Sequence, residues 1–159
     1  MHESALYKWH IKMASIRSGI GGNMDRYLYK AKRIDNGEWV QGYYVKGLDV
    51  YGKEVHLIFE PNTMFYSSGE TDGWYKVDPS TICRCAGLKD KNGKLIYEND
   101  IVWDSDERAF YEIIWNQEDM CWNVEDADGH KSEFEECYGS TIEVNGNRFD
   151  NSELLESEG

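Results

Sequence analysis

A chain of 159 residues, 40% of them hydrophobic and 14% aromatic, is long enough to form one domain with a sizeable core. Its formal net charge is −13, and the excess is local, since residues 98–159 hold nineteen acidic and three basic side chains. Because a phosphate backbone is bound by lysine and arginine, we expect no direct nucleic-acid backbone binding through this acidic third. No apolar run of about eighteen residues occurs, so no membrane partner is expected.

Residues 1–23 carry a weak amphipathic pattern that ends in a glycine-rich stretch, and Met24 follows at once. We interpret them as a leader, flexible or weakly helical, which leaves Met1 and Met24 as two candidate starts. The alternative is a basic helix that docks on a surface such as the acidic third. Because no continuous apolar segment resembles an export signal, we predict a cytoplasmic location and reduced cysteines.

Alternating apolar and polar residues, rich in aromatic and β-branched types, predict short strands along the rest of the chain. Residues 61–73 show no such period and are predicted to form a long loop. Residues 78–80 are predicted to form a turn or a single helical turn. The predicted strands are 26–33, 38–45, 54–59, 74–77, 82–88, 109–115, 120–125, 131–135 and 141–144.

The spacing of these strands predicts a mainly β fold: a small β-barrel or sandwich with an SH3-like, hairpin-rich C-terminal part and little helix. We assign residues 24–155 to one β domain. Its N-terminal strands occupy 24–82, and the central hairpin and acidic C-terminal half occupy 83–155. Residues 156–159 are assigned to a tail, and a last helical turn is expected around Leu154 and Leu155.

The centre of the chain is residues 87–102, GLKDKNGKLIYENDIV. Asn92-Gly93 is typical of a type I′ hairpin turn, which requires positive φ angles at both central residues. Asn99-Asp100 predicts a second tight corner before the apolar residues that follow. The segment therefore predicts turn, strand, turn and strand within sixteen residues.

Three segments resemble the YopX-like family of small phage and prophage proteins: residues 32–42 (KRIDNGEWVQG), 78–102 with the central hairpin, and 142–155 (IEVNGNRFDNSELL). The resemblance extends over residues 24–155. It implies a mostly β fold, a mobile-element origin in a bacterial host cell and no established activity. The family usually has glycine where this chain has Asn99. Because asparagine is the best non-glycine residue in a left-handed conformation, the corner should survive.

The four cysteines are Cys83, Cys85, Cys121 and Cys137, and they include no CxxC pair. Cys83 and Cys85 lie two residues apart and would face the same side of a strand. With the other two they could in principle make a four-sulfur zinc site. Since zinc knuckles usually use CxxC turns, we interpret the cysteines as packing thiols and predict neither a metal nor a cofactor.

No other motif suggests catalysis. His56 lies in an apolar strand and His130 in a turn, and neither accompanies a serine or cysteine that would imply a triad. Residues 19–23 (GIGGN) lack the strand and the lysine of a phosphate-binding loop. Carboxylates that could form acid–base pairs or bind Ca²⁺ or Mg²⁺ are interpreted as solvated surface: Asp104, Asp106, Glu107, Glu133, Glu135 and Glu136.

Five tryptophans could stack on bases or sugars, but most are expected to build the core: Trp39, Trp74, Trp103, Trp115 and Trp122. We therefore expect no catalytic residue. The leading hypothesis is a non-enzymatic phage or prophage accessory protein that acts through protein–protein interaction with an unknown host or phage protein. Alternatives are an acidic DNA mimic or DNA-processing accessory protein, and an enzyme with an unrecognised site. The sequence also leaves homo-oligomerisation open as an alternative.

Overall fold

A computed structural model describes residues 25–65, 71–134 and 140–156. The prediction of a mainly β fold with little helix is confirmed. In chain order the elements are η1 (Asp25–Tyr27), β1 (Tyr29–Lys32), β2 (Trp39–Leu48), β3 (Glu54–Phe65), β4 (Thr71–Lys76), η2 (Pro79–Thr81), β5 (Cys83–Lys89), β6 (Leu95–Tyr97), β7 (Asp100–Asp104), β8 (Ala109–Asn116), β9 (Cys121–Glu125), β10 (Lys131–Glu133), β11 (Ile142–Asn147) and α2 (Glu153–Glu156).

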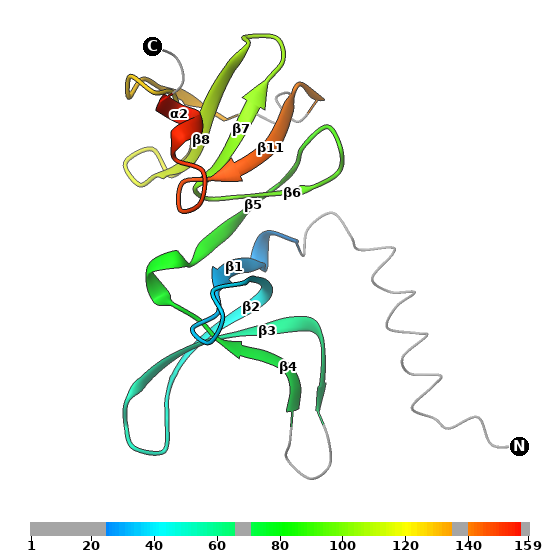
Figure 1. Cartoon of the computed structure of the whole chain (residues 1–159), viewed down its shortest axis with the longest axis vertical. Helices are drawn as coiled ribbons and strands as arrows, with labels where there is room; N and C mark the ends of the chain where they lie inside the picture. The colour runs from blue at the N-terminus through cyan, green and yellow to red at the C-terminus, as the bar shows by residue number, and fades with distance from the viewer. Residues whose placement is uncertain (1–24, 66–70, 135–139, 157–159) are drawn as a thin grey trace, which may run out of the picture.

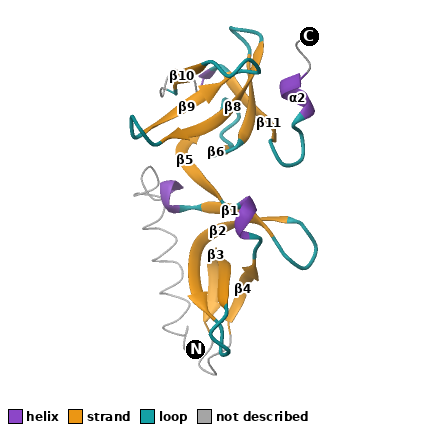
Figure 2. Cartoon of the chain, turned by 90° about the vertical axis from the view of Figure 1, so that its left-hand side faces the viewer, coloured by secondary structure: helices purple, strands orange, loops and turns teal. Residues whose placement is uncertain are grey.

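The strands pair antiparallel in two sheets, with the orders β4-β3-β2-β1-β5-β6 and β10-β9-β8-β7-β11. Figures 1 and 2 show β1–β4 in the lower part of the molecule and β7–β11 in the upper part. We call these two parts the N-terminal lobe and the C-terminal lobe. Each sheet has two edge strands, so the described strands form a sandwich-like pair of open sheets and no closed barrel.

Strand β5 joins the two lobes, because it pairs with β1 at Arg84 and Cys83 and with β6 at Cys85 and Lys89. Between the lobes lies a small buried cluster of Leu28, Cys83, Cys85 and Tyr97. The core of the N-terminal lobe is built from Ala31, Ile58 and Val77. The core of the C-terminal lobe consists of Ile96, Val102, Ile113, Val124, Phe134 and Ile142. Full burial of one such isoleucine contributes about 1.5–3 kcal/mol.

Three hairpin turns share the sequence pattern Asp-x-x-Gly: residues 49–53 (DVYGK), 90–94 (DKNGK) and 126–130 (DADGH). In each turn the aspartate N–H donates to the carbonyl four residues on, and the glycine N–H donates back to the aspartate carbonyl. One carboxylate oxygen accepts from the N–H groups two and four residues on. The three glycines have φ angles of 79°, 80° and 83°, which cost glycine little. The shared aspartate is a signal that the sequence analysis missed.

The prediction of positive φ at both Asn92 and Gly93 is wrong for Asn92. Among the described residues of this turn only Gly93 has a positive φ. The loop holds three residues instead of two, because Asp90 and Lys94 close it through the N–H of Asp90 and the carbonyl of Lys94. The Asp90 side chain stabilises this longer loop. The corner at Asn99 has the expected left-handed backbone, with φ at 65°.

The prediction of a long loop at residues 61–73 is also wrong for most of that segment. Strand β3 continues to Phe65 and β4 begins at Thr71, while residues 66–70 lie outside the described part. The pairing register shifts between Phe59 and Met64, and the Thr63 hydroxyl donates to the carbonyl oxygens of Glu60 and Gly73. This irregularity disrupts the period-two alternation, so the sequence pattern does not reveal that β3 continues to Phe65.

Two predicted helical turns are present in the structure, whereas the predicted leader and most of the predicted tail lie outside the described residues. Residues 78–80 begin a 3₁₀ turn that Asp78 caps by accepting the Ser80 N–H. The last helical turn is α2, which contains Leu154 and Leu155. The predicted leader, residues 1–23, and residues 157–159 of the predicted tail lie outside the described residues.

Candidate functional site

The β2–β3 hairpin projects from the N-terminal lobe, away from the C-terminal lobe (Figure 1). Its turn is the first of the three Asp-x-x-Gly turns. The Asp49 carboxylate accepts the N–H groups of Tyr51 and Lys53, both at 2.9 Å. Gly52 donates its N–H back to the Asp49 carbonyl. These bonds fix the backbone at the end of the hairpin.

The side chains at this fixed turn are apolar and exposed. Val50 is 92% exposed, Tyr51 is 91% exposed and Leu48, at the end of β2, is 70% exposed. Single exposed apolar residues are common on monomers, but a group of them that includes tyrosine is typical of contact surfaces. We call Leu48, Val50 and Tyr51 the hairpin tip, and we treat it as a candidate interaction surface.

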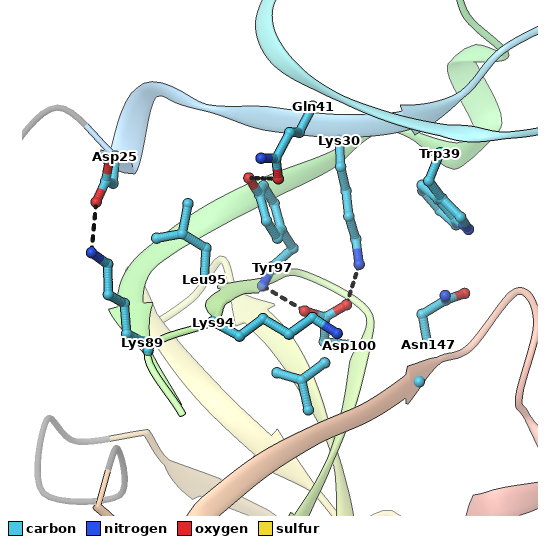
Figure 3. A pocket seen from close by; sticks show the side chains of 13 residues that line it. Asp25, Lys30, Trp39, Gln41, Lys89, Lys94, Leu95, Tyr97, Asp100 and Asn147 are labelled. Atoms are coloured by element: carbon cyan, nitrogen blue, oxygen red, sulfur yellow. Dashed lines mark hydrogen bonds and ion pairs between the residues drawn. The ribbon is translucent and has the colours of Figure 1, made fainter. Parts of the chain in front are cut away.

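A cavity of about 620 Å³ lies between the two lobes (Figure 3). This volume lies in the range of pockets that bind small molecules. Lys30 and Trp39 reach the cavity from the N-terminal lobe, Lys94 and Tyr97 from the β5–β6 hairpin, and Asp100 and Asn147 from the C-terminal lobe. The interlobe cavity is the second candidate site.

Asp100, which is 1% exposed, is one of the residues that line the interlobe cavity. One carboxylate oxygen is ion-paired with Lys30, and the other accepts the Tyr97 N–H at 2.8 Å. Burial raises the pKa of the Asp100 carboxyl, and the charge of Lys30 acts in the opposite direction. The Lys30 ammonium lies 5.0 Å from the ring centroid of Trp39 and 5.2 Å from that of Tyr97. Cation–π contacts with these two rings therefore stabilise the Lys30 ammonium in addition to its ion pair with Asp100.

The loop after β11 ties the C-terminal lobe to β1 and β2 beside the cavity. Asp150 accepts the Trp39 indole N–H at 2.6 Å and is ion-paired with Lys32. The hydrogen bond from Lys32, followed by that from Trp39, lowers the pKa of the Asp150 carboxyl. The rings of Trp39 and Phe149 lie 5.8 Å apart. Trp39 is thus held from both lobes.

Two further buried carboxylates, Asp90 in the β5–β6 turn and Glu112 in β8, were missed by the sequence analysis. Asp90 accepts the Val144 N–H at 3.0 Å in addition to its two turn bonds, so it ties the central hairpin to β11. Glu112 is buried in β8, and its Oε1 lies 3.1 Å from the Arg148 guanidinium without hydrogen-bond geometry. Burial raises the pKa of the Glu112 carboxyl, and the charge of Arg148 acts in the opposite direction. Both side chains stabilise connections within the fold.

The cysteine pair proposed as a zinc-site alternative lies in the cluster between the lobes. Cys83 and Cys85 are both buried, in contact with Leu28 and Tyr97. Burial raises the pKa of Cys83 to about 11 and also raises the pKa of Cys85. Cys121 is half-buried on β9, and Cys137 lies outside the described residues. Cys83 Sγ donates to the Thr81 carbonyl and accepts from the Asn99 amide, and Cys85 Sγ accepts the Gly87 N–H, so both thiols are packed and hydrogen-bonded within the fold.

The two histidines lie in separate places. His56, in β3, contacts the Tyr44 hydroxyl through Nδ1 at 2.6 Å and the Glu54 carboxylate through Nε2 at 2.9 Å. None of these three residues lines the interlobe cavity. His130 lies exposed in the third Asp-x-x-Gly turn, where its side chain contacts Asp126 at 3.2 Å. The structure does not bring the two histidines to a common site.

The acidic groups of the C-terminal lobe also lie apart. Asp104, interpreted from the sequence as solvated, is instead buried at the end of β7, 2% exposed, where its carboxylate accepts the Asp106 N–H at 2.9 Å. Asp106 and Glu107 are in the turn before β8, whereas Glu118 and Asp119 are in the turn after it. Asp126, Asp128 and His130 place one potential ligand atom each within 4.8 Å of one another. This grouping follows from the Asp-x-x-Gly turn itself. Glu133 is exposed on β10, and Glu135 and Glu136 lie outside the described residues.

The tryptophans pack at the margins of the cores instead of filling them. Trp103 meets Phe110 at 4.8 Å between ring centroids, and Trp115 meets Trp122 at 5.2 Å. The Arg84 guanidinium lies 4.8 Å from the Trp115 ring and 5.3 Å from the Trp122 ring. Trp74 is exposed on β4. Most of these rings therefore contact other side chains of the same protein.

None of the described helices is long and apolar enough to cross a membrane.

Together, these features define a two-lobed antiparallel β protein with a projecting hairpin tip and a cavity between its lobes. The family described as YopX protein matches residues 29–156, and the chain belongs to this family. A solved structure, that of protein yopX from Bacillus subtilis, is similar to it at 18% sequence identity. The match covers 82% of this chain and 98% of that chain, with a TM-score of 0.47. No curated protein matches the chain.

Proposed function

We propose that this YopX-family chain is a non-enzymatic phage or prophage accessory protein that binds another protein in the cytoplasm of the bacterial host. The observation that carries the proposal is the hairpin tip. It presents Leu48, Val50 and Tyr51 to solvent on a turn whose backbone is already hydrogen-bonded. Because an ordered turn loses little conformational entropy on binding, its apolar side chains are efficient anchors.

The acidic DNA-mimic alternative has weaker support. The carboxylates of the described C-terminal lobe are distributed over turns at both ends of β8. A surface that imitates the phosphates of DNA would need them in a continuous stripe on one side. The enzyme alternative is supported least, because the hydrogen-bonded Tyr44, His56 and Glu54 do not line the interlobe cavity.

The test compares three versions of the full chain as bait in a lysate of the bacterium that carries the gene. They are the wild type, the tip variant Val50→Ser/Tyr51→Ser, and the matched control Ile34→Ser. Ile34 is an exposed apolar residue in the β1–β2 turn of the same lobe, outside the hairpin tip. We expect a protein that is captured by the wild type and the control and lost by the tip variant.

A second measurement separates a different partner from a second copy of the chain. Light scattering of the purified wild type and tip variant gives the molar mass of each. A larger mass for the wild type alone would make the tip a self-association surface. Capture of the same proteins by all three baits, with equal masses, would contradict the assignment of the interface to the hairpin tip.

A further inference from the structure

The interlobe cavity carries an excess of positive charge inside a strongly acidic protein. Its lining includes three lysines, Lys30, Lys89 and Lys94, and two aspartates, Asp25 and Asp100. Lys30 is ion-paired with Asp100, and the Lys89 ammonium lies 3.6 Å from the Asp25 carboxylate. Lys94 has no ion-pair partner among the described residues. The lining therefore holds one positive charge that no described residue neutralises by direct contact.

The neighbouring carboxylate Asp90 does not change this conclusion. It lies in electrostatic range of Lys94, but it is buried beneath the turn and does not line the cavity. Its two oxygens already accept the N–H groups of Asn92, Lys94 and Val144. On the cavity side, Asp100 also lies in electrostatic range of Lys94, but Asp100 is already paired with Lys30.

Gln41 and Lys94 offer hydrogen-bond donors to the cavity. Gln41 accepts the Tyr97 hydroxyl through Oε1, at 3.2 Å, and no described residue accepts from its side-chain N–H₂. Lys94 offers three N–H donors and Gln41 offers two. Both Asp100 oxygens are already engaged by Lys30 and Tyr97. A ligand that suits these donors brings its own acceptor oxygens.

An apolar wall completes the cavity (Figure 3). Leu95 and Tyr97 of β6 lie on the same side as the Lys94 stem, and Trp39 lies opposite them in β2. Val144 of β11 also lines the cavity. These side chains offer contact area to a flat or hydrocarbon group that follows an anionic head group into the cavity.

We propose that the interlobe cavity binds a small organic anion, with a phosphate or carboxylate group at Lys94 and Gln41 and a flat apolar group against Leu95 and Tyr97. With these contacts, bound ligand bridges β2 of the N-terminal lobe and the β5–β6 hairpin. The proposal is independent of the hairpin tip, which lies at the far end of the N-terminal lobe (Figure 1).

The test is an NMR titration of the ¹⁵N-labelled full chain with three probes: AMP, benzoate and adenosine. AMP and benzoate combine a flat ring with a phosphate or a carboxylate, and adenosine is the uncharged counterpart of AMP. The Gly93 and Gly146 amides and the Trp39 indole N–H report on the cavity, because all three residues line it. We expect saturable shifts of these signals with AMP or benzoate at a Kd of about 1 mM or below, and none with adenosine.

The variant for this test is Lys94→Gln, with Lys131→Gln as the matched control. Lys131 is exposed on β10 and does not line the cavity, so both variants lose one positive charge. Lys30 is not a suitable choice, since its loss would leave Asp100 buried without its partner. We expect Lys94→Gln to weaken binding at least about tenfold, the scale of one charged hydrogen bond, and Lys131→Gln to leave it unchanged.

The probes also distinguish the two head groups, since binding of AMP alone assigns a phosphate and binding of benzoate alone assigns a carboxylate. Three results would each overturn the proposal. The first is the absence of saturable shifts with both anions up to about 10 mM. The second is saturable binding of adenosine with the affinity of AMP. The third is equal affinity of Lys94→Gln and the wild type.

Discussion

The ammonium of Lys30 and the carboxylate of Asp100 form an ion pair that joins β1 of the N-terminal lobe to β7 of the C-terminal lobe across seventy residues of sequence. We expect Asp100→Asn to lower the free energy of unfolding by about 3 kcal/mol, the lower end for a broken buried pair, because Lys30 keeps slight contact with water. Denaturant unfolding measures the change.

The matched control for this pair is Lys46→Ala. Lys46 and Glu54 form an ion pair at 2.8 Å on the surface of the β2–β3 hairpin, where both side chains are exposed. Its loss should change the free energy of unfolding by less than about 1 kcal/mol. Equal effects of the two substitutions would show that the Lys30–Asp100 pair is fully screened by solvent.

Asp90 should give the protein a pH-dependent contribution to stability. Burial acts to raise the pKa of this carboxyl, but the N–H groups of Val144, Lys94 and Asn92 outweigh it, so the pKa is lowered. A lowered folded-state pKa adds stability above the unfolded value of about 3.9, and this stability is lost as the pH falls through the folded-state pKa. Asp90→Asn should therefore cost about 1–2 kcal/mol at neutral pH, and the difference from wild type should shrink below about pH 4.

Asp49→Asn is the control for the extra bond to Val144. Asp49 occupies the same place in an Asp-x-x-Gly turn, but its carboxylate accepts only the two turn N–H groups. An asparagine side-chain oxygen can replace it. We expect a change below about 0.5 kcal/mol, the usual limit for surface substitutions. A wild-type-like Asp90→Asn would show that the bond to Val144 contributes nothing.

Gly93 should resist substitution because of its backbone conformation. A Cβ atom at Gly93 would meet no heavy atom within 4 Å, yet its φ is 80°. A β-branched side chain is strained there, so Gly93→Val should cost about 1–3 kcal/mol. Gly47→Val is the control, because Gly47 lies in β2 with open space and no positive φ. That substitution should be neutral or slightly stabilising in thermal unfolding, and equal losses at both sites would contradict the turn assignment.

The buried thiols should be slow to alkylate. Nucleophilic attack requires the thiolate, and burial raises the pKa of Cys83 to about 11 while blocking access to it. With iodoacetamide at about pH 8, we expect native Cys83 and Cys85 to stay unmodified while half-buried Cys121 reacts. Peptide mass spectrometry after a timed quench reads each site, and unfolded protein supplies the reference. Labelling of Cys83 at the rate of Cys121 would show that the interlobe cluster opens readily.

Local chemistry in the sequence was sufficient to predict much of the fold. Strand alternation, turn glycines and the left-handed corner at Asn99 depend on near neighbours in the chain, and they are present in the structure. The outer part of the β3–β4 hairpin was predicted as a loop, because the irregular register there removes the alternation. The type of turn at Asn92 was wrong because the Asp90 side chain, two residues earlier, selects a longer loop.

Neither the hairpin tip nor the interlobe cavity could be predicted from local patterns in the sequence. The exposure of Val50 and Tyr51 depends on the distance that the β2–β3 hairpin extends beyond the rest of its lobe. The interlobe cavity depends on contacts between distant residues, such as Lys30 with Asp100. No spacing rule links a lysine in one strand to an aspartate seventy residues later, so a single sequence carries no signal of that pair.

The bond between Trp39 and Asp150 has a consequence for synthesis of the protein on the ribosome. These residues are separated by 111 positions, yet Asp150 is the hydrogen-bond acceptor for a side chain in the second strand. The N-terminal lobe can form its own hairpins while the chain is still being translated. Its surface beside the cavity must wait until residue 150 has left the exit tunnel. Until then Trp39 and Lys32 lack their native partner, and we expect the nascent chain to be most accessible to chaperones at this surface.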